Sequence, residues 1–173
     1  MATKKLMWVL FGILVISAWV LGLAIQAGAE TMKCRIAGTE TKNEIISVGD
    51  EKGHILGQQI MQGLAFFENG EIAKRITYAL YDFTPGKGAQ AIGYTILTFE
   101  DGSTMVYRFQ RLLVSDQSGN FSAKTTSDLI KGTGRFEGIK GTASSTGKNF
   151  PASKEEAARD TSDTTFTYTL PAK

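Results

Sequence analysis

Segments in which apolar and polar residues alternate occupy much of the chain, and this pattern restricts the possible folds more than any other feature of the sequence. Clear examples are residues 72–83, 91–99 and 104–112, which are rich in β-branched and aromatic residues. A period of two with this composition is typical of strands that bury one face. An Asp101-Gly102 turn joins the last two segments and is a strong hairpin signal. Successive hairpins predict an antiparallel meander, which buries its apolar face by closing into a barrel or packing as a sandwich.

One short helix is expected near the C-terminus. Ser153-Lys154-Glu155-Glu156 has the S-x-x-E form of a capping box, and Ala157 to Arg159 can extend the helix by a turn. The last expected strand, residues 164–170, follows this segment. The sequence therefore predicts an all-β domain with a single helix over residues 153–159.

The first 29 residues have the composition of a targeting segment. Lys4 and Lys5 are their only charges and precede an apolar run without charge over residues 6–25. Ala27 and Ala29 flank a glycine and provide the small side chains of a signal-peptide cleavage site. We expect residues 1–29 to be a secretory signal peptide, with a retained membrane anchor over residues 6–25 as the alternative. In both cases the body lies outside the cytoplasm, because the positive flank stays inside the cell. We expect a secreted or periplasmic protein, with a membrane-anchored one as the alternative.

The body of the chain is electrically balanced. Nineteen Lys and Arg residues less Lys4 and Lys5 leave 17 basic groups in residues 30–173, against 17 acidic groups. Proteins that bind nucleic acid depend on an excess of Lys and Arg, so we expect no nucleic-acid partner. The only expected contact with a membrane is through the N-terminal segment, if it is uncleaved. Cys34 is the only cysteine, so no internal disulfide can form and the body must be held by its own core.

The sequence contains no recognisable catalytic set and no cofactor motif. Gly132, Gly134 and Gly138 have the spacing G-x-G-x-x-x-G, which fits neither the dinucleotide fingerprint nor the P-loop. We interpret these glycines as tight turns of a barrel and predict no cofactor. His54 is the only histidine, and we predict an exposed residue and no metal site.

Aromatic residues on three neighbouring segments are the candidate ligand-binding residues. Period two places Tyr78, Tyr94 and Tyr107 each on the face of its segment that is richer in large apolar groups, and that face is expected to be the interior. In a barrel, inward side chains can line a ligand cavity, and tyrosine hydroxyls together with Arg108 would supply the polar contacts. The predicted ligand is a small hydrophobic molecule, and the predicted ligand-binding residues are Tyr78, Tyr94, Tyr107 and Phe109.

Several segments resemble the allene oxide cyclase-type barrel family. Residues 128–142, DLIKGTGRFEGIKGT, followed by residues 164–170, look like the closing part of such a barrel. Residues 55–57 and 60–64 resemble its opening strands, and residues 94–101 its central hairpin. The resemblance implies a closed antiparallel calycin-type barrel of about eight strands over residues 45–173, related in shape to dirigent proteins and lipocalins. Residues 30–44 are then an N-terminal segment outside the barrel.

The catalytic residues of that family are not matched. Allene oxide cyclases carry a glutamate-x-asparagine pair and a cysteine, whereas the cysteine position here is Ala65 and the nearest pair, Asn43-Glu44, has the reverse order. We therefore expect an exported barrel that binds a small hydrophobic molecule, or presents its surface to a partner. The alternative is a cyclase or isomerase that acts by confining an apolar substrate, which requires few charged residues.

Overall fold

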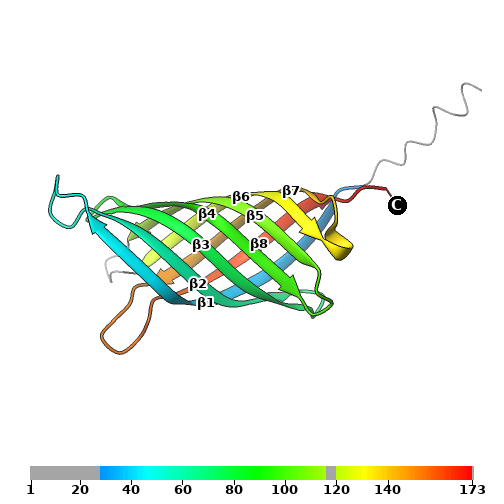
Figure 1. Ribbon diagram of the computed structural model, residues 1–173, viewed down its shortest axis with the longest axis horizontal. Coiled ribbons are helices and arrows are strands. Elements are labelled where there is room, and N and C mark those ends of the chain that lie inside the picture. Colours follow the sequence, from blue (N-terminus) through cyan, green and yellow to red (C-terminus); the bar gives the residue numbers. More distant parts are fainter. Residues whose placement is uncertain (1–27, 116–119, 173) are drawn as a thin grey trace, which may run out of the picture. The chain divides into compact units, whose positions relative to one another are not determined.

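Eight antiparallel strands pair in sequence order, and the last pairs with the first, so the sheet closes into a barrel (Figure 1). The computed structural model describes residues 28–115 and 120–172. The closed all-β barrel expected from the sequence is confirmed. Its strands are β1 (Glu30–Ser47), β2 (Ile55–Phe67), β3 (Ile72–Thr84), β4 (Gly88–Phe99), β5 (Thr104–Ser115), β6 (Phe121–Thr133), β7 (Lys140–Phe150) and β8 (Arg159–Thr169), with a 3-10 turn, η1 (Gly134–Phe136), between β6 and β7.

The barrel begins earlier in the chain than the sequence suggested. β1 starts at Glu30, and it pairs with β8 from Glu30 to Thr39 and with β2 from Cys34 to Ser47. Residues 30–44, which we set apart as an N-terminal segment, are therefore part of the barrel wall. Most of the expected signal or anchor helix falls in residues 1–27, which lie outside the described residues. Within the described part of the chain, no helix is long and apolar enough to cross a membrane.

The helix expected over residues 153–159 is wrong. Ser153 Oγ accepts hydrogen bonds from the backbone N–H groups of Glu155 and Glu156, both at 3.1 Å, as a helix cap would. The chain does not continue as a helix, because Arg159 already pairs with Thr39 on β1 and with Phe150 on β7. A helix of about two turns has an unfavourable nucleation step to overcome, and here the two ladders of β8 compete for its last residue. The only helical element among the described residues is η1.

The period of two is confirmed in every one of the three segments, but the inward face was assigned wrongly on β3 and β4. Tyr78 is 46% exposed and Tyr94 49%, whereas Tyr107 is 6% exposed and Phe109 2%. The register explains the error, because Tyr78 lies opposite Tyr94, and Tyr94 lies opposite Arg108 rather than Tyr107. Paired residues share a face of the sheet, so both tyrosines point outward with Arg108.

Apart from Arg75, the residues buried on β3 are small, because large ones from other strands fill the space. They are Ala73, Thr77 and Ala79. The interior of an eight-stranded barrel is only wide enough for side chains to fill it, so large and small residues must alternate around it. The most apolar face of a strand is therefore not always the inner one in this barrel.

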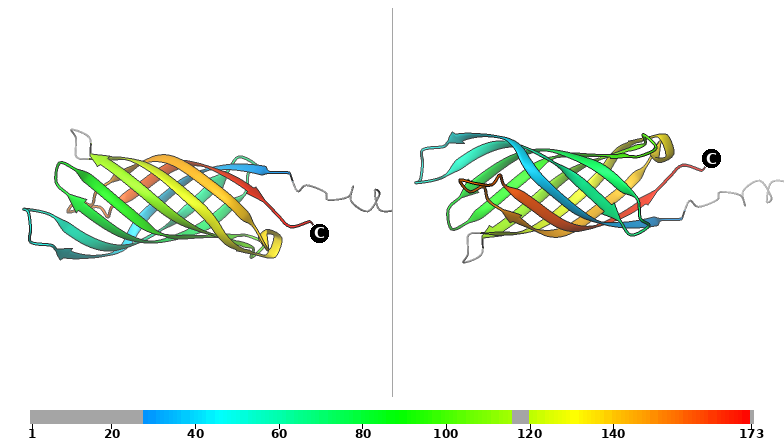
Figure 2. Two further views of the ribbon diagram at one scale, coloured as in Figure 1. Left: turned by 90° about the horizontal axis from the view of Figure 1, so that it is seen from above. Right: turned by 90° about the horizontal axis from the view of Figure 1, so that it is seen from below.

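Aromatic side chains close one end of the barrel. Six rings contact one another there, with centroids of neighbouring rings 4.9 to 6.5 Å apart. They belong to Phe67, Phe99, Phe136, Phe166, Tyr107 and Tyr168. Arg135 of η1 lies over the rings of Phe99 and Phe136 at 4.7 and 4.9 Å, and pairs with Glu71 at 2.6 Å. Figure 2 shows η1 at this end and the β1–β2 and β7–β8 connections at the other. We call these the closed end and the mouth.

The glycine-rich segment forms the turn at the closed end, as the sequence predicted. Gly134 has φ 62° and Gly138 has φ 73°, a conformation that other residues rarely adopt. A Cβ atom on Gly138 would lie 2.5 Å from Pro171 Cγ, and one on Gly134 would lie 2.4 Å from Ser103 Oγ. Both positions therefore require glycine for their backbone conformation and for close packing.

Because Tyr107 is buried and Tyr94 is exposed, we expect substitution by alanine to lower the stability of the barrel much more at Tyr107. Tyr107→Ala removes a buried ring and should lower the free energy of unfolding by about 3–5 kcal/mol. Tyr94→Ala, on the adjacent strand and outer face, should lower it by less than about 1 kcal/mol. Urea denaturation of both variants measures the difference. Equal losses would contradict the assignment of faces.

Candidate functional site

A cavity opens into the barrel at the mouth. Its volume is about 380 Å³, within the range of small-molecule sites. Phe109 and Met61 lie at its inner end, and residues 150–152 and Ala158 of the β7–β8 connection form one side. The apolar side chains of its wall are Ile55, Ala79, Phe83, Ala89, Ala91, Leu113 and Phe121.

A few polar groups interrupt this apolar wall. Gln59 donates a hydrogen bond from Nε2 to Glu40 Oε2, and the Tyr81 hydroxyl donates to Asn43 Oδ1 at 2.9 Å. Arg111 reaches the cavity from β5. A ligand in the mouth would therefore meet mostly apolar surface, with fixed polar groups to orient it.

Below the mouth, an ion pair crosses the barrel interior. Arg75 Nη1 donates to both carboxylate oxygens of Asp160 at 3.0 Å, and the two side chains are 2% and 3% exposed. Arg111 Nη1 lies 3.8 Å from Asp160 Oδ2, and Arg111 Nε donates to Thr125 Oγ1 at 3.0 Å. Two guanidinium groups thus share one buried carboxylate.

Two glycines make room for the ion pair. Register places Arg75 of β3 opposite Gly63, Gly63 opposite Gly38, and Gly38 opposite Asp160 of β8. The arginine side chain can therefore cross β2 and β1 where no side chain stands in its way. A Cβ atom on Gly38 would lie 2.9 Å from Asp160 Oδ1 and 3.2 Å from Arg75 Nη2. The pair and the glycines form one structural unit that spans four strands.

Burial determines the ionisation of the groups around this pair. Burial lowers the pKa of Arg111, while Asp160 raises it and Arg75 lowers it further. Arginine stays protonated in proteins, so this direction reflects the cost of burying its charge. Burial also raises the pKa of the Tyr107 phenol, which therefore stays neutral. Among these groups of the interior, Asp160 is the one anion, and it faces the two cations Arg75 and Arg111.

The structure separates the predicted ligand-binding residues. Phe109 borders the mouth, and Tyr107 lies deeper, in the polar interior and against Phe166 of the closed end. Tyr78 and Tyr94 are on the outer wall, as is Arg108, which pairs with Asp128 at 3.1 Å. Tyr78, Tyr94 and Arg108 therefore do not face a ligand inside the barrel.

Sequence reasoning missed Arg75, Arg111 and Asp160. A signal existed for Arg111, because period two places it on the same face as Tyr107 and Phe109. For Arg75 the local signal was misleading, because Arg75 shares a face with Ala73, Thr77 and Ala79, and that less apolar face was expected to point outward. Asp160 lies between the expected helix and the last expected strand, where no periodic pattern assigned it a face. The meeting of Arg75 with Asp160 depends on the pairing of β1 with β8.

His54 links the β1–β2 connection to β3 at the mouth. Its Nδ1 lies 2.6 Å from Asp50 Oδ1 and its Nε2 lies 3.0 Å from Asp82 Oδ1. The hydrogen bond to Asp50 raises the pKa of the imidazole most, and Asp82 adds to it. Ligand atoms of Asp50, Glu51 and His54 lie within 4.8 Å of one another, but both ring nitrogens already contact carboxylates. A Lys87–Glu51 pair at 2.8 Å joins the β1–β2 connection to the β3–β4 connection. We interpret the cluster as a structural link between hairpins.

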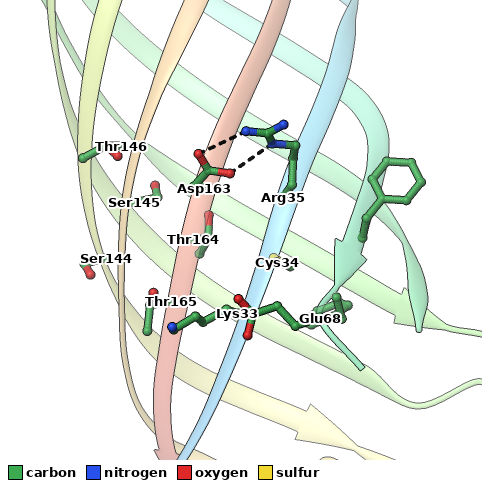
Figure 3. A pocket seen from close by; sticks show the side chains of 12 residues that line it. Lys33, Cys34, Arg35, Glu68, Ser144, Ser145, Thr146, Asp163, Thr164 and Thr165 are labelled. Carbon is green, nitrogen blue, oxygen red and sulfur yellow. Dashed lines mark hydrogen bonds and ion pairs between the residues drawn. The ribbon is translucent and has the colours of Figure 1, made fainter. Parts of the chain in front are cut away.

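A second hollow lies on the outer wall across β7, β8, β1 and β2 (Figure 3). Arg35 and Asp163 face each other there at 3.1 Å, with side chains 72% and 69% exposed. Such exposed pairs contribute little. Cys34 borders the hollow, but burial and Asp163 raise the pKa of its thiol to about 12. The thiol therefore stays protonated and is a poor nucleophile.

The outer wall also carries exposed apolar side chains. Four of them line a groove of about 520 Å³ over β1 to β4. These four are 44% to 69% exposed and are Ile46, Leu56, Leu80 and Ile92. Contiguous apolar surface of this kind often marks an interaction site. The groove is the second place where an apolar molecule could bind.

Comparisons with known proteins identify the fold. No model of a known protein family matches the chain, and no curated protein matches it in sequence. The solved structure of the pterocarpan synthase dirigent protein GePTS1 is 11% identical, covers 83% of this chain and 92% of its own, and has a TM-score of 0.50. That of PsPTS1, also a pterocarpan synthase dirigent protein, is 12% identical, with coverages of 84% and 97% and a TM-score of 0.50.

At these identities the likeness concerns the fold alone. It confirms the shape relationship with dirigent proteins that the resemblance implied. It gives no support to allene oxide cyclases specifically.

The buried ion pair predicts a large difference between two aspartates of the same strand. Asp160→Asn leaves the buried guanidinium of Arg75 and the partly buried one of Arg111 without a carboxylate, and it should lower the free energy of unfolding by about 3–5 kcal/mol. Asp163→Asn breaks only the exposed pair with Arg35 and should cost less than about 1 kcal/mol. Chemical denaturation of the two variants tests this. A small loss for Asp160→Asn would show that the pair does not stabilise the barrel.

Proposed function

We propose that this protein is an exported barrel that binds a small hydrophobic molecule in its mouth. The observation that carries the proposal is the mouth itself, an apolar cavity of about 380 Å³ with the guanidinium of Arg111 at its inner part. An apolar molecule gains by leaving water for such a wall. Arg111, Glu40 and Gln59 are the polar groups available to fix its orientation.

Export is the second part of the proposal. It rests on the composition of residues 1–29, and on the balanced charge of the body, which favours no nucleic-acid partner. The unpaired cysteine is compatible with an oxidising compartment, because its buried thiol is protonated.

A confined reaction is the alternative function. The two similar structures carry the name pterocarpan synthase, but a shared fold is weak support for a shared activity. The feature that favours this alternative is Glu40, a carboxylate beside an apolar cavity, where it is placed to accept a proton from a bound molecule. Orientation by the cavity wall would supply the rest.

Retention of a ligand tests the proposal. The purified body, residues 30–173, is incubated with a lipid extract, separated from free lipid, and the retained molecules are identified by mass spectrometry. A retained molecule that stays unchanged supports binding, whereas one that is converted with time supports the cyclase or isomerase. Retention of no molecule would overturn both.

Filling the mouth should abolish binding while leaving the fold intact. Ala89→Trp places a large ring in the cavity and should reduce the affinity for N-phenyl-1-naphthylamine, a neutral fluorescent probe, by at least about tenfold. Thr98→Trp, on the outer face of the same strand, is the matched control and should bind as the wild type does.

A third variant distinguishes the mouth from the outer groove. Leu80→Gln makes the groove more polar without touching the mouth, because Leu80 is 57% exposed on the outer wall. If probe binding falls in Leu80→Gln and persists in Ala89→Trp, the ligand site is the groove and the proposal for the mouth is wrong.

Export predicts a mature protein that begins at Glu30. Intact-mass measurement of the protein recovered from outside the cytoplasm of its native host should show the loss of residues 1–29. A membrane-bound species that retains Met1 would instead support the anchor over residues 6–25.

A further inference from the structure

A small polar chamber lies beneath the mouth. Phe109 and Arg111 border both spaces, so the chamber and the mouth are neighbours with these two side chains between them. Seven Ser and Thr residues and the guanidinium groups of Arg75 and Arg111 contribute to its wall. A wall of hydroxyl and guanidinium groups is rich in hydrogen-bond donors.

The chamber has donors that the protein does not satisfy. Arg75 Nε and Nη2 and Thr164 Oγ1 are buried and have no hydrogen-bond partner among the described residues. Other groups are already engaged: Thr77 and Thr95 bond each other at 2.8 Å, and Thr125 accepts from Arg111. Buried donors without an acceptor are costly, so the arrangement favours an acceptor in the chamber.

The charge at this place is not balanced by the protein. Arg75 and Arg111 carry two positive charges, and Asp160 is their shared carboxylate. Glu40 lies in the mouth and bonds Gln59, and it does not border the chamber. The Arg75 side chain is 2% exposed and that of Arg111, which borders the mouth, 16%. A net positive charge in so largely buried a place favours an anion, and a neutral water molecule would leave the net charge unchanged.

We propose that the chamber binds a monatomic anion, a halide such as chloride, between Arg75 and Arg111. The chamber has a volume of about 10 Å³, which is room for one small particle such as a single water or a monatomic ion and too little for a sulfate or phosphate. The halide accepts hydrogen bonds from Nε and Nη2 of Arg75 and from the Thr164 hydroxyl. Its negative charge neutralises the excess positive charge of the two arginines. This site is deeper than the mouth and shares Arg111 with it.

Halide binding should stabilise the barrel. Thermal and urea unfolding of the full chain are compared in sodium chloride, sodium bromide and sodium gluconate at one ionic strength. Above the dissociation constant, the unfolding equilibrium constant should fall about tenfold for each tenfold rise in halide, and gluconate should have no such effect. Crystals grown in bromide should give an anomalous peak between Arg75 and Arg111.

Two arginines of the same strand supply the variants. Arg111→Met removes the excess charge and keeps the Arg75–Asp160 pair, so the variant should fold and lose its response to halide. Arg108→Met, the matched control, breaks only the exposed pair with Asp128 and should keep the full response. A wild type without halide response, a response that survives Arg111→Met, or bromide crystals without the anomalous peak would each overturn the proposal.

Discussion

The pairing of β1 with β8 is the constraint on which the rest of the structure depends. It converts a meander of eight strands into a closed barrel without a free edge. Closure also fixes the rows of residues that face each other across the interior, because each strand has two neighbours and one register with each. The row from Arg75 through Gly63 and Gly38 to Asp160 exists only because the sheet closes.

The closed interior is divided by chemistry along its axis. Aromatic rings fill the closed end, a polar layer around the Arg75–Asp160 pair occupies the middle, and an apolar cavity opens at the mouth. The polar layer is the unusual part, because a buried ion pair gains little over a well-packed apolar core of the same volume. A role in binding would explain why two arginines and one aspartate occupy that layer.

Rigid walls connect this arrangement to the proposed function. The chamber is bordered by strands that are hydrogen-bonded on both sides, and so is the mouth except on the side formed by the β7–β8 connection. Most of the wall is therefore preformed, and a ligand need order little of the chain. Arg111 borders both spaces, and a ligand in the mouth would therefore lie next to any anion in the chamber. The likeness to dirigent proteins concerns the barrel fold alone. What this protein binds is inferred from the side chains of its own interior.

The sequence by itself determined the local structure of this protein. Alternation defined the strands, and glycines such as Gly102 and Gly138 marked turns that need positive φ, because both signals depend only on neighbouring residues. A local signal failed at Ser153, where a helix cap is followed by bends over residues 154–156 and then by β8, which begins at Arg159. The inward face of β3 and the meeting of Arg75 with Asp160, 85 residues apart, were decided only by the tertiary structure. Register and closure set these features, since the narrow interior selects which side chains fit only after all eight strands are in place.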